Sequence, residues 1–296
     1  MIINDTVDYQ SLAGKIEGVS FIDCPQDNTV LYVGKKLENR LHKLDQTRNC
    51  VVMLEEGMLL DDAIAESNTV IYSKHLLADY GLLSKILYDR ENEQLSTAEY
   101  QMVNGATIST SAEIGDNVLI ESGAFIDHKV IIGAGTRIRG GARIHHACIG
   151  EYCDIGEYTV IGAPSFTNTL DADGNRVPIY ALSEVTIGDH VHISEFTRVN
   201  RGQSRSTTIG EYAKIDGHVA IGHDSVVGRN AVIAGSAILA GFVTIADNAY
   251  VGIGALLKPF VSVGENTTIG IGAVVVRSQP DNALAVGNPA KTLKKR

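Results

Sequence analysis

The fold is decided by a stretch in the second half of the chain, residues 208–233, which reads TIGEYAKIDGHVAIGHDSVVGRNAVI. An aliphatic residue recurs there at every sixth position, and the period continues without a slip to Val275. Six is not a multiple of the helical repeat of about 3.6 residues. It is even, so every member of the series points to the same face of an extended segment. The period therefore predicts short strands, not helices.

The six-residue period extends over most of the chain after residue 100. The 25 aliphatic positions that carry it, called rungs below, run from Ile108 to Ile144, Ile149 to Ile161, Ile187 to Val199 and Ile209 to Val275. Strands this short cannot bury an apolar face alone, but stacking them as a parallel β-helix gives each one neighbours. The pattern resembles the left-handed parallel β-helix of hexapeptide-repeat acyltransferases, which has three rungs per coil. The resemblance implies about eight coils.

Both interruptions of the repeat begin on one edge of this predicted prism. Rungs three apart lie one above the other, so the column that contains Ile161 also contains Val199. The two insertions, residues 162–186 and 200–208, each follow a rung of this column. Loops that a rigid scaffold aims at one place often carry function. We therefore expect the principal site beside them, with the longer insertion as a flap over the acceptor.

Residues 1–100 lack the six-residue period and are predicted to form a small α/β domain that binds nucleotide or substrate, ahead of a β-helix domain over residues 101–296. Strand-like runs cover Val30–Val33, Cys50–Leu54 and Thr69–Tyr72, and helical spacing covers Leu37–Asp45 and Leu76–Tyr88. The polar run Asp89–Gln94 is predicted to be the linker between the two domains.

The composition disfavours several classes of protein. With 25 Lys and Arg against 35 Asp and Glu, the formal net charge of −10 disfavours an electrostatic binder of nucleic acid or of anionic membrane. Four cysteines without a CxxC pair indicate a reducing compartment, so we expect a cytoplasmic protein. No apolar run reaches the roughly 18 residues of a membrane span. The pairs His145–His146 and His190–His192 lack zinc-site spacing, so no metal is predicted.

His223 is the strongest candidate for chemistry. It follows rung Ile221 on the column of the insertions, between the level of Asn200-Arg201-Gly202 and that of Gly241. An imidazole can take a proton from an attacking amine at neutral pH. A glycine N–H can stabilise the oxyanion of a tetrahedral intermediate. The alternative is a solvated surface histidine, and the converging insertions favour the catalytic interpretation.

The segments around these residues resemble the active-site region of the UDP-3-O-acylglucosamine N-acyltransferase family. The likeness rests on Asn200-Arg201-Gly202, Thr208-Ile209-Gly210, Lys214-Ile215-Asp216, Ile221-Gly222-His223-Asp224 and the loop from Val160-Ile161-Gly162-Ala163 to Val185-Thr186-Ile187-Gly188-Asp189. It implies a homotrimer with sites between subunits, His223 as general base and Gly241 as oxyanion donor. The substrate contacts that follow from it are Asn200, Arg201, Asp216 and His218, with Tyr32 and Lys35 from the N-terminal domain.

Three features depart from the family pattern. The uracil-binding motif, an aromatic residue followed by Asn-x-Lys-aromatic, reads Leu31-Tyr32-Val33-Gly34-Lys35-Lys36-Leu37, with Gly34 and Leu37 at two of its positions. A second family histidine is replaced near Lys258-Pro259-Phe260. The segment Ala285-Val286-Gly287-Asn288-Pro289-Ala290-Lys291 resembles the tail of hexapeptide acetyltransferases that use coenzyme A, which makes Lys258, Asn288 and Lys291 candidate donor contacts.

The sequence therefore predicts an N-acyltransferase that moves an acyl group from a thioester donor to a nucleotide-activated amino sugar in lipopolysaccharide or surface-glycan synthesis. Acyl-CoA is the favoured donor, and no bound cofactor is expected. One alternative is the lipid A enzyme itself, with a hydroxyacyl carrier protein as donor. The other alternative is a non-catalytic β-helix that binds a protein partner.

Overall fold

A computed structural model describes residues 2–3 and 7–293, which form two compact units. The first unit holds the chain up to Ser96 together with Phe166–Ser183 and Gln203–Arg205, and the second holds Thr97–Ser165, Glu184–Gly202 and the chain from Ser206 onward. The predicted insertions thus leave the repeat and pack with the first unit. None of the helices in the described ranges has the length and apolarity needed to cross a membrane.

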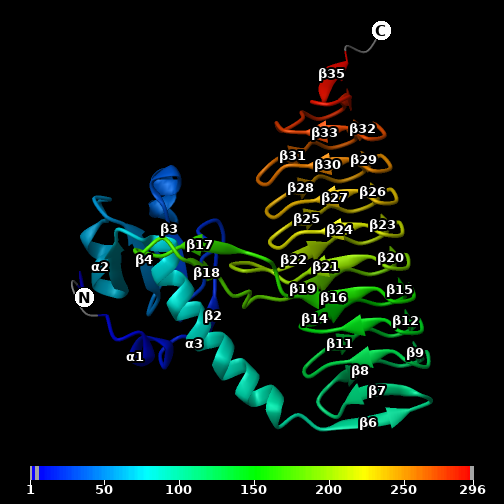
Figure 1. Ribbon diagram of the computed structural model, residues 1–296, viewed down its shortest axis with the longest axis horizontal. Helices are drawn as coiled ribbons and strands as arrows, with labels where there is room; N and C mark the ends of the chain where they lie inside the picture. Colours follow the sequence, from blue (N-terminus) through cyan, green and yellow to red (C-terminus); the bar gives the residue numbers. More distant parts are fainter. Residues whose placement is uncertain (1, 4–6, 294–296) are drawn as a thin grey trace. The chain divides into compact units, whose positions relative to one another are not determined.

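The second unit is a parallel β-helix whose two- to four-residue strands form three sheets (Figure 1). Sheet 1 contains β6 (Tyr100–Val103), β7 (Ala106–Ser109), β10 (Phe125–Ile126), β13 (Arg143–Ile144), β16 (Val160–Ala163), β21 (Arg198–Asn200), β24 (Ala220–Ile221), β27 (Ile238–Leu239), β30 (Leu256–Leu257) and β33 (Val274–Val275). Sheet 2 contains β8 (Glu113–Ile114), β11 (Ile131–Ile132), β14 (Ala147–Ile149), β19 (Val185–Ile187), β22 (Thr207–Ile209), β25 (Val226–Val227), β28 (Thr244–Ile245) and β31 (Ser262–Val263).

Sheet 3 completes each coil. It contains β9 (Leu119–Ile120), β12 (Arg137–Ile138), β15 (Asp154–Ile155), β20 (His192–Ile193), β23 (Lys214–Ile215), β26 (Val232–Ile233), β29 (Tyr250–Val251), β32 (Thr268–Ile269), β34 (Leu284–Val286) and β35 (Lys291–Leu293). The chain passes from sheet 1 to sheet 2 to sheet 3 and back, and neighbouring strands of a sheet are parallel. The antiparallel pairs β6–β7 and β34–β35 lie at the two ends.

The register matches the columns that the six-residue period predicts. In sheet 1, Ile144 pairs with Ile161, which pairs with Val199, and the column continues to Ile221 and Leu239. These rungs are fully buried inside the prism. The residue before each rung points outward because successive side chains of a strand face opposite sides. The period therefore encodes both the core and the register.

The turns between the sheets explain the residues that separate the rungs. A non-glycine residue with positive φ recurs there, and Asn, Asp, His and aromatic residues fill most of these places. Asn and Asp tolerate this left-handed conformation better than other side chains. Stacking adds support where larger residues occupy it. Tyr152, His190 and Tyr212 form one stack at ring distances of 5.3 and 4.8 Å, and Tyr158, Phe196 and His218 form another at 5.4 and 5.2 Å.

The first unit is an α/β unit around a parallel sheet in the order β1-β5-β4-β3-β2. Its strands are β1 (Ile2–Ile3), β2 (Gly18–Val19), β3 (Thr29–Val33), β4 (Val51–Glu55) and β5 (Thr69–Ser73), and its helices are α1 (Tyr9–Ala13), the 3-10 helix η1 (Lys35–Leu44), α2 (Asp62–Ser67) and α3 (Leu76–Ser96). The buried side chains of β3, β4 and β5 fill two apolar clusters, one on each face of the sheet. The three predicted strands are present with ends shifted by one residue, the helix predicted from Leu37 is a 3-10 helix, and the helix predicted from Leu76 is longer than expected.

One prediction about this region is wrong. The run Asp89–Gln94 is not a linker but continues α3, since its Glu, Gln and Arg residues favour a helix. The middle of the longer insertion belongs to the first unit, and its role as a flap over the acceptor stays a prediction. It forms the antiparallel hairpin of β17 (Asn168–Leu170) and β18 (Arg176–Pro178), and Ile179 behind it belongs to an apolar cluster of the first unit. Asp171 accepts the backbone N–H groups of Asp173 and Asn175 and closes the turn.

Candidate active site

His223 lies on the edge between sheets 1 and 2, directly after β24. On this edge the turn after β21 carries Asn200 and Arg201, and the turn after β27 carries Gly241. The three positions come from consecutive coils, so they follow one another along the prism at roughly 4.8 Å per coil. The structure therefore brings Arg201, His223 and Gly241 into one column, as the rung spacing predicts.

The imidazole of His223 is held by its neighbour in sequence. Its Nδ1 is 2.7 Å from Oδ2 of Asp224, whose side chain is completely buried, whereas the imidazole is 18% exposed. Asp224 has φ of 58°, a conformation that Asp adopts more readily than most residues. Because a carboxylate can only accept, the Nδ1 proton points at Asp224 and the lone pair belongs to Nε2. This is the tautomer that a general base needs.

Gly241 permits the imidazole to lie against the next coil. A Cβ built on Gly241 would be 2.5 Å from Nε2 of His223 and 2.7 Å from Cε1, closer than any real side chain allows. Among the described residues, no backbone carbonyl accepts the Gly241 N–H. The basic nitrogen of His223 and a glycine backbone thus lie together at this edge. The chemistry that fits them is proton abstraction beside a developing oxyanion.

The coils beyond His223 present apolar side chains. The His223 ring meets Phe242 edge-on at 5.3 Å, and Phe242 stacks on Phe260 at 4.7 Å. On the outer face of sheet 1, the next two strands after β24 expose Ile238 and Leu256, at 47% and 43%. We call these four residues the apolar strip. It begins at the imidazole and continues for two coils toward the C-terminus.

Asn200 and Arg201 are buried and make hydrogen bonds within the chain. Nδ2 of Asn200 donates to the carbonyl oxygens of Pro164 at 2.7 Å and Ala163 at 3.3 Å, and the backbone N–H of Arg201 donates to Ala163. Both side chains are buried. They join the starts of the two insertions, so in this chain they shape the edge below His223. Direct contact of either residue with substrate stays a prediction.

Asp216 and His218 lie on another edge of the prism. They precede β24 and belong to the turn between sheets 3 and 1, whereas His223 follows the strand. Asp216 accepts the backbone N–H groups of Gly217 at 2.8 Å and Gly235 at 3.0 Å, and His218 stacks on Phe196. Within one chain the structure does not bring these two residues to His223. Their role as substrate contacts follows from the family resemblance and stays a prediction.

The predicted donor contacts are spread along the C-terminal half of the β-helix. Lys258 follows the rung Leu257 two strands beyond β24 in sheet 1, and its side chain is exposed. Asn288 and Lys291 are exposed at the terminal pair of β34 and β35, which belongs to sheet 3. Lys258 therefore shares the outer face of the apolar strip, and the other two residues do not.

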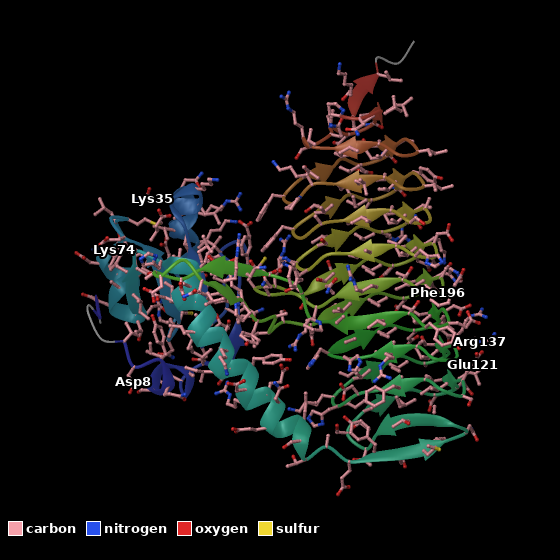
Figure 2. All side chains as sticks on the ribbon, viewed as in Figure 1. Asp8, Lys35, Lys74, Glu121, Arg137 and Phe196 are labelled. Atoms are coloured by element: carbon pink, nitrogen blue, oxygen red, sulfur yellow. The ribbon has the colours of Figure 1, made fainter. Side chains whose placement is uncertain are left out.

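Tyr32 and Lys35 lie in the first unit at the carboxyl end of β3. Tyr32 packs on Tyr80 with ring centroids 4.6 Å apart, and its ring is partly buried. The backbone N–H of Lys35 donates to Glu55 at 3.0 Å, and its Nζ is 3.8 Å from the same carboxylate. In Figure 2, Lys35 and Lys74 mark this half of the molecule. The carboxyl ends of parallel strands are where such sheets bind ligands, which leaves a substrate role for Lys35 open as a prediction.

Sequence reasoning missed Asp224, although the signal was present. The column argument used the second residue after each rung, and Asp224 is the third. The adjacent letters His-Asp at a turn that favours a left-handed aspartate could have identified the pair.

Comparisons with known proteins identify the family of the repeat. The family model for the bacterial transferase hexapeptide (six repeats) matches residues 111–146. The solved structure of a UDP-N-acetylglucosamine acyltransferase from Campylobacter jejuni is 30% identical, with a TM-score of 0.58, over 65% of this chain and 74% of that one. The chain belongs to the hexapeptide-repeat acyltransferase family. The predicted left-handed parallel β-helix is confirmed by this membership.

Two curated relatives narrow the likeness within the hexapeptide-repeat acyltransferases. A UDP-3-O-acylglucosamine N-acyltransferase of Polynucleobacter asymbioticus is 32% identical over 123 residues, which is 40% of this chain and 35% of that protein. A probable mitochondrial UDP-3-O-acylglucosamine N-acyltransferase of Arabidopsis thaliana is 33% identical over 104 residues, which is 35% of this chain and 34% of that protein. The chain spans about a third of the length of these relatives.

Proposed function

We propose that this chain is an N-acyltransferase that moves an acyl group from a thioester to the amino group of a nucleotide-activated amino sugar in lipopolysaccharide or surface-glycan synthesis. One observation carries the proposal: His223 is fixed by the buried Asp224 with its Nε2 against Gly241. The names of the relatives support the substrate class, since they act on UDP-linked glucosamine derivatives.

The reaction proceeds by direct attack on the thioester carbonyl. The sugar amine forms the new C–N bond while its proton passes to Nε2 of His223, and the Gly241 N–H stabilises the oxyanion. Collapse of the tetrahedral intermediate breaks the C–S bond. The imidazolium returns its proton to the departing thiolate, so the free thiol and the amide are the products. Asp224 stays ionised and keeps the imidazole in the required tautomer.

The apolar strip bears on the length of the acyl chain that the donor carries. Phe242 and Phe260 with Ile238 and Leu256 offer a surface that suits an acyl chain longer than acetyl. This observation favours the second candidate function, the lipid A enzyme with a hydroxyacyl carrier-protein donor. The coenzyme A donor rests on Lys258, Asn288 and Lys291, of which Lys258 alone shares this face. In both donors the acyl group is held by a thioester bond, so the reaction at the carbonyl is the same.

The assembly of the active enzyme belongs to the proposal as well. The family resemblance implies a homotrimer with sites between subunits. Asp216 and His218 lie on the edge between sheets 3 and 1, whereas His223 lies on the edge between sheets 1 and 2. A neighbouring copy offers a way for such residues to face substrate. Gel filtration with light scattering reports the oligomeric state.

The proposed function is tested by thiol release from acyl-CoAs and acyl carrier proteins of several chain lengths with UDP- and dTDP-amino sugars. Wild type is expected to turn over with at least one pair of substrates, and His223→Ala is expected to lose about a hundredfold or more. The matched control is His192→Ala, at an exposed histidine of sheet 3. Equal rates for wild type and His223→Ala would contradict the proposal and favour the non-catalytic binding protein.

A further inference from the structure

Arg201 carries a charge that is buried beside the candidate active site. Only 3% of the residue is exposed, and its backbone N–H donates to Ala163. A guanidinium stays protonated and has five donors, so a buried arginine needs an anionic partner. Among the described residues, Thr207 Oγ1 is the one buried side-chain nitrogen or oxygen without a hydrogen-bond partner. The buried atoms of the Arg201 guanidinium therefore have acceptors.

Two carboxylates are buried in the part of the chain that the structure describes, those of Asp127 and Asp224. Asp127 has donors of its own, which are the Tyr100 hydroxyl at 2.7 Å, the His128 backbone N–H at 2.8 Å and Nδ1 of His145 at 2.5 Å. Burial alone would raise the pKa of Asp127, but these hydrogen bonds outweigh it and hold the pKa well below its ordinary value. Asp127 also follows β10, three strands before β21 in sheet 1. Asp224 is therefore the buried carboxylate that can serve Arg201.

Asp224 lies one coil beyond Arg201 on the same edge of the prism. The register pairs Val199 of β21 with Ile221 of β24, so the turn residues that follow these two rungs lie one above the other. Arg201 has the same place in its turn as His223, and Asp224 is the next residue. Neighbouring coils are separated by roughly 4.8 Å, a distance that an arginine side chain spans. The guanidinium can therefore reach the buried carboxylate.

The other charged groups around His223 do not balance these buried charges. Oδ2 of Asp224 accepts from Nδ1 of His223, and a carboxylate can take a second donor on its other oxygen. Glu184, which precedes β19 beside this edge, and Lys258, two strands beyond β24, are both exposed. A neutral imidazole leaves the negative charge of Asp224 uncompensated. The buried cation of Arg201 compensates it, and an ion pair is the arrangement in which buried charges are tolerated.

We propose that Arg201 forms a buried ion pair with Asp224 and is a positioning residue, which acts on His223 through that carboxylate. The pair keeps Asp224 ionised. An ionised Asp224 accepts from Nδ1 and leaves Nε2 of His223 as the basic nitrogen. The inference rests on the proposed function for the role of His223 as a base. Direct contact of Arg201 with substrate, which the family resemblance implies, is the alternative that the experiments separate.

The kinetic test compares Arg201→Gln and Arg201→Lys with wild type in acyl transfer over a range of pH. In Arg201→Gln the imidazole loses a nearby positive charge and takes up a proton more readily. The acidic limb of the kcat profile is therefore expected to move to higher pH by about one unit, a loss of about tenfold on that limb, with KM for both substrates little changed. Arg201→Lys keeps the charge, so its acidic limb is expected near that of wild type.

The matched control is Arg137→Ala, which removes an exposed cation of sheet 3 that pairs with Glu121 (Figure 2). This variant should have the kcat and the pH profile of wild type, because an exposed ion pair is screened by solvent.

The second test measures the ion pair itself by denaturant unfolding of the full chain as Arg201→Gln, Asp224→Asn and the double variant. Each single substitution leaves a buried charge without its partner, whereas the double variant leaves neither charge. We expect the double variant to be more stable than Arg201→Gln alone. Where Arg201→Gln alone does not fold, a folded double variant gives the same result. This measurement does not require turnover.

The outcomes separate this inference from the proposed function. A double variant that loses the sum of the two single losses in unfolding free energy overturns the ion pair. A rise in the acceptor KM of Arg201→Gln, with kcat and its pH profile unmoved, assigns Arg201 to the substrate and also overturns the inference. Non-additive unfolding in a protein that transfers no acyl group removes the proposed function and leaves the ion pair standing.

Discussion

At the scale of single residues, the proposed chemistry depends on which nitrogen of His223 carries the proton. Asp224 decides this because its buried carboxylate accepts from Nδ1. In Asp224→Asn the new amide can donate to Nδ1 and reverse the tautomer, which removes the base from Nε2. We expect turnover to fall by about a hundredfold or more with KM little changed. Steady-state kinetics together with thermal melting checks this, and near-normal turnover in a folded variant would show that the tautomer does not matter.

The position of Gly241 makes a second prediction. In Gly241→Ala the new Cβ would occupy the space of His223 Nε2, so the ring must move off its productive position. We expect a loss of turnover on the order of a hundredfold, since small displacements of a catalytic group are costly. Gly18→Ala is the matched control, because a Cβ there meets nothing within 4 Å. Steady-state kinetics measures the turnover of both variants. Turnover of Gly241→Ala equal to that of Gly18→Ala would exclude a tight contact between Gly241 and the imidazole.

The ionised carboxylate of Asp127 is expected to contribute to the free energy of unfolding. Its pKa is depressed in the folded state, so its contribution is present above the unfolded pKa near 3.9 and is lost as the pH falls below about 4. Asp127→Asn is expected to lower the free energy of unfolding by about 1–3 kcal/mol at pH 7. The difference from wild type should shrink toward pH 3. Denaturant unfolding at both pH values measures it, and a pH-independent difference would argue against the ionised carboxylate.

At the scale of elements, sequence reasoning succeeded where local burial sets the pattern. The rungs are predictable because each one must enter the prism, and the register follows from counting. The segment that forms the hairpin of β17 and β18 was predicted as an insertion, but not as part of the first unit. Its docking depends on contacts far apart in sequence. Ser84 accepts the backbone N–H of Tyr180, a contact that no local pattern reveals.

The packing of the β17–β18 hairpin against α3 can be tested. A Cβ on Gly81 would be 2.9 Å from the carbonyl oxygen of Pro178. Alanine in a helix normally adds about 1 kcal/mol over glycine, so a net loss of about 1–3 kcal/mol in Gly81→Ala would report the displaced hairpin. Gly14→Ala is the control, where the nearest atom is 3.5 Å away. Limited proteolysis should cut residues 166–183 faster in Gly81→Ala, and a stabilised, uncut variant would contradict the packing.

At the scale of the whole molecule, the β-helix brings His223 and Gly241 to successive coils on one edge, where the proposed reaction would occur. The alignment of His223 with Gly241 could be predicted from the sequence because the six-residue period fixes which turns lie on successive coils. Asp216 and His218 lie on a different edge of the same coil, and their predicted contact with substrate rests on the family resemblance. The partners of His145 were missed because Asp127 is 18 residues away but only one coil below.

The most direct test of the central claim is single-turnover acyl transfer to a nucleotide-activated amino sugar, compared between wild type and His223→Ala. A panel of carrier-protein and CoA thioesters from acetyl to long chains covers both donors. The account predicts amide formation by wild type, faster with a long chain than with acetyl because of the apolar strip, and a loss of about a hundredfold or more in the variant. Amide formation at the wild-type rate by a folded His223→Ala would contradict it.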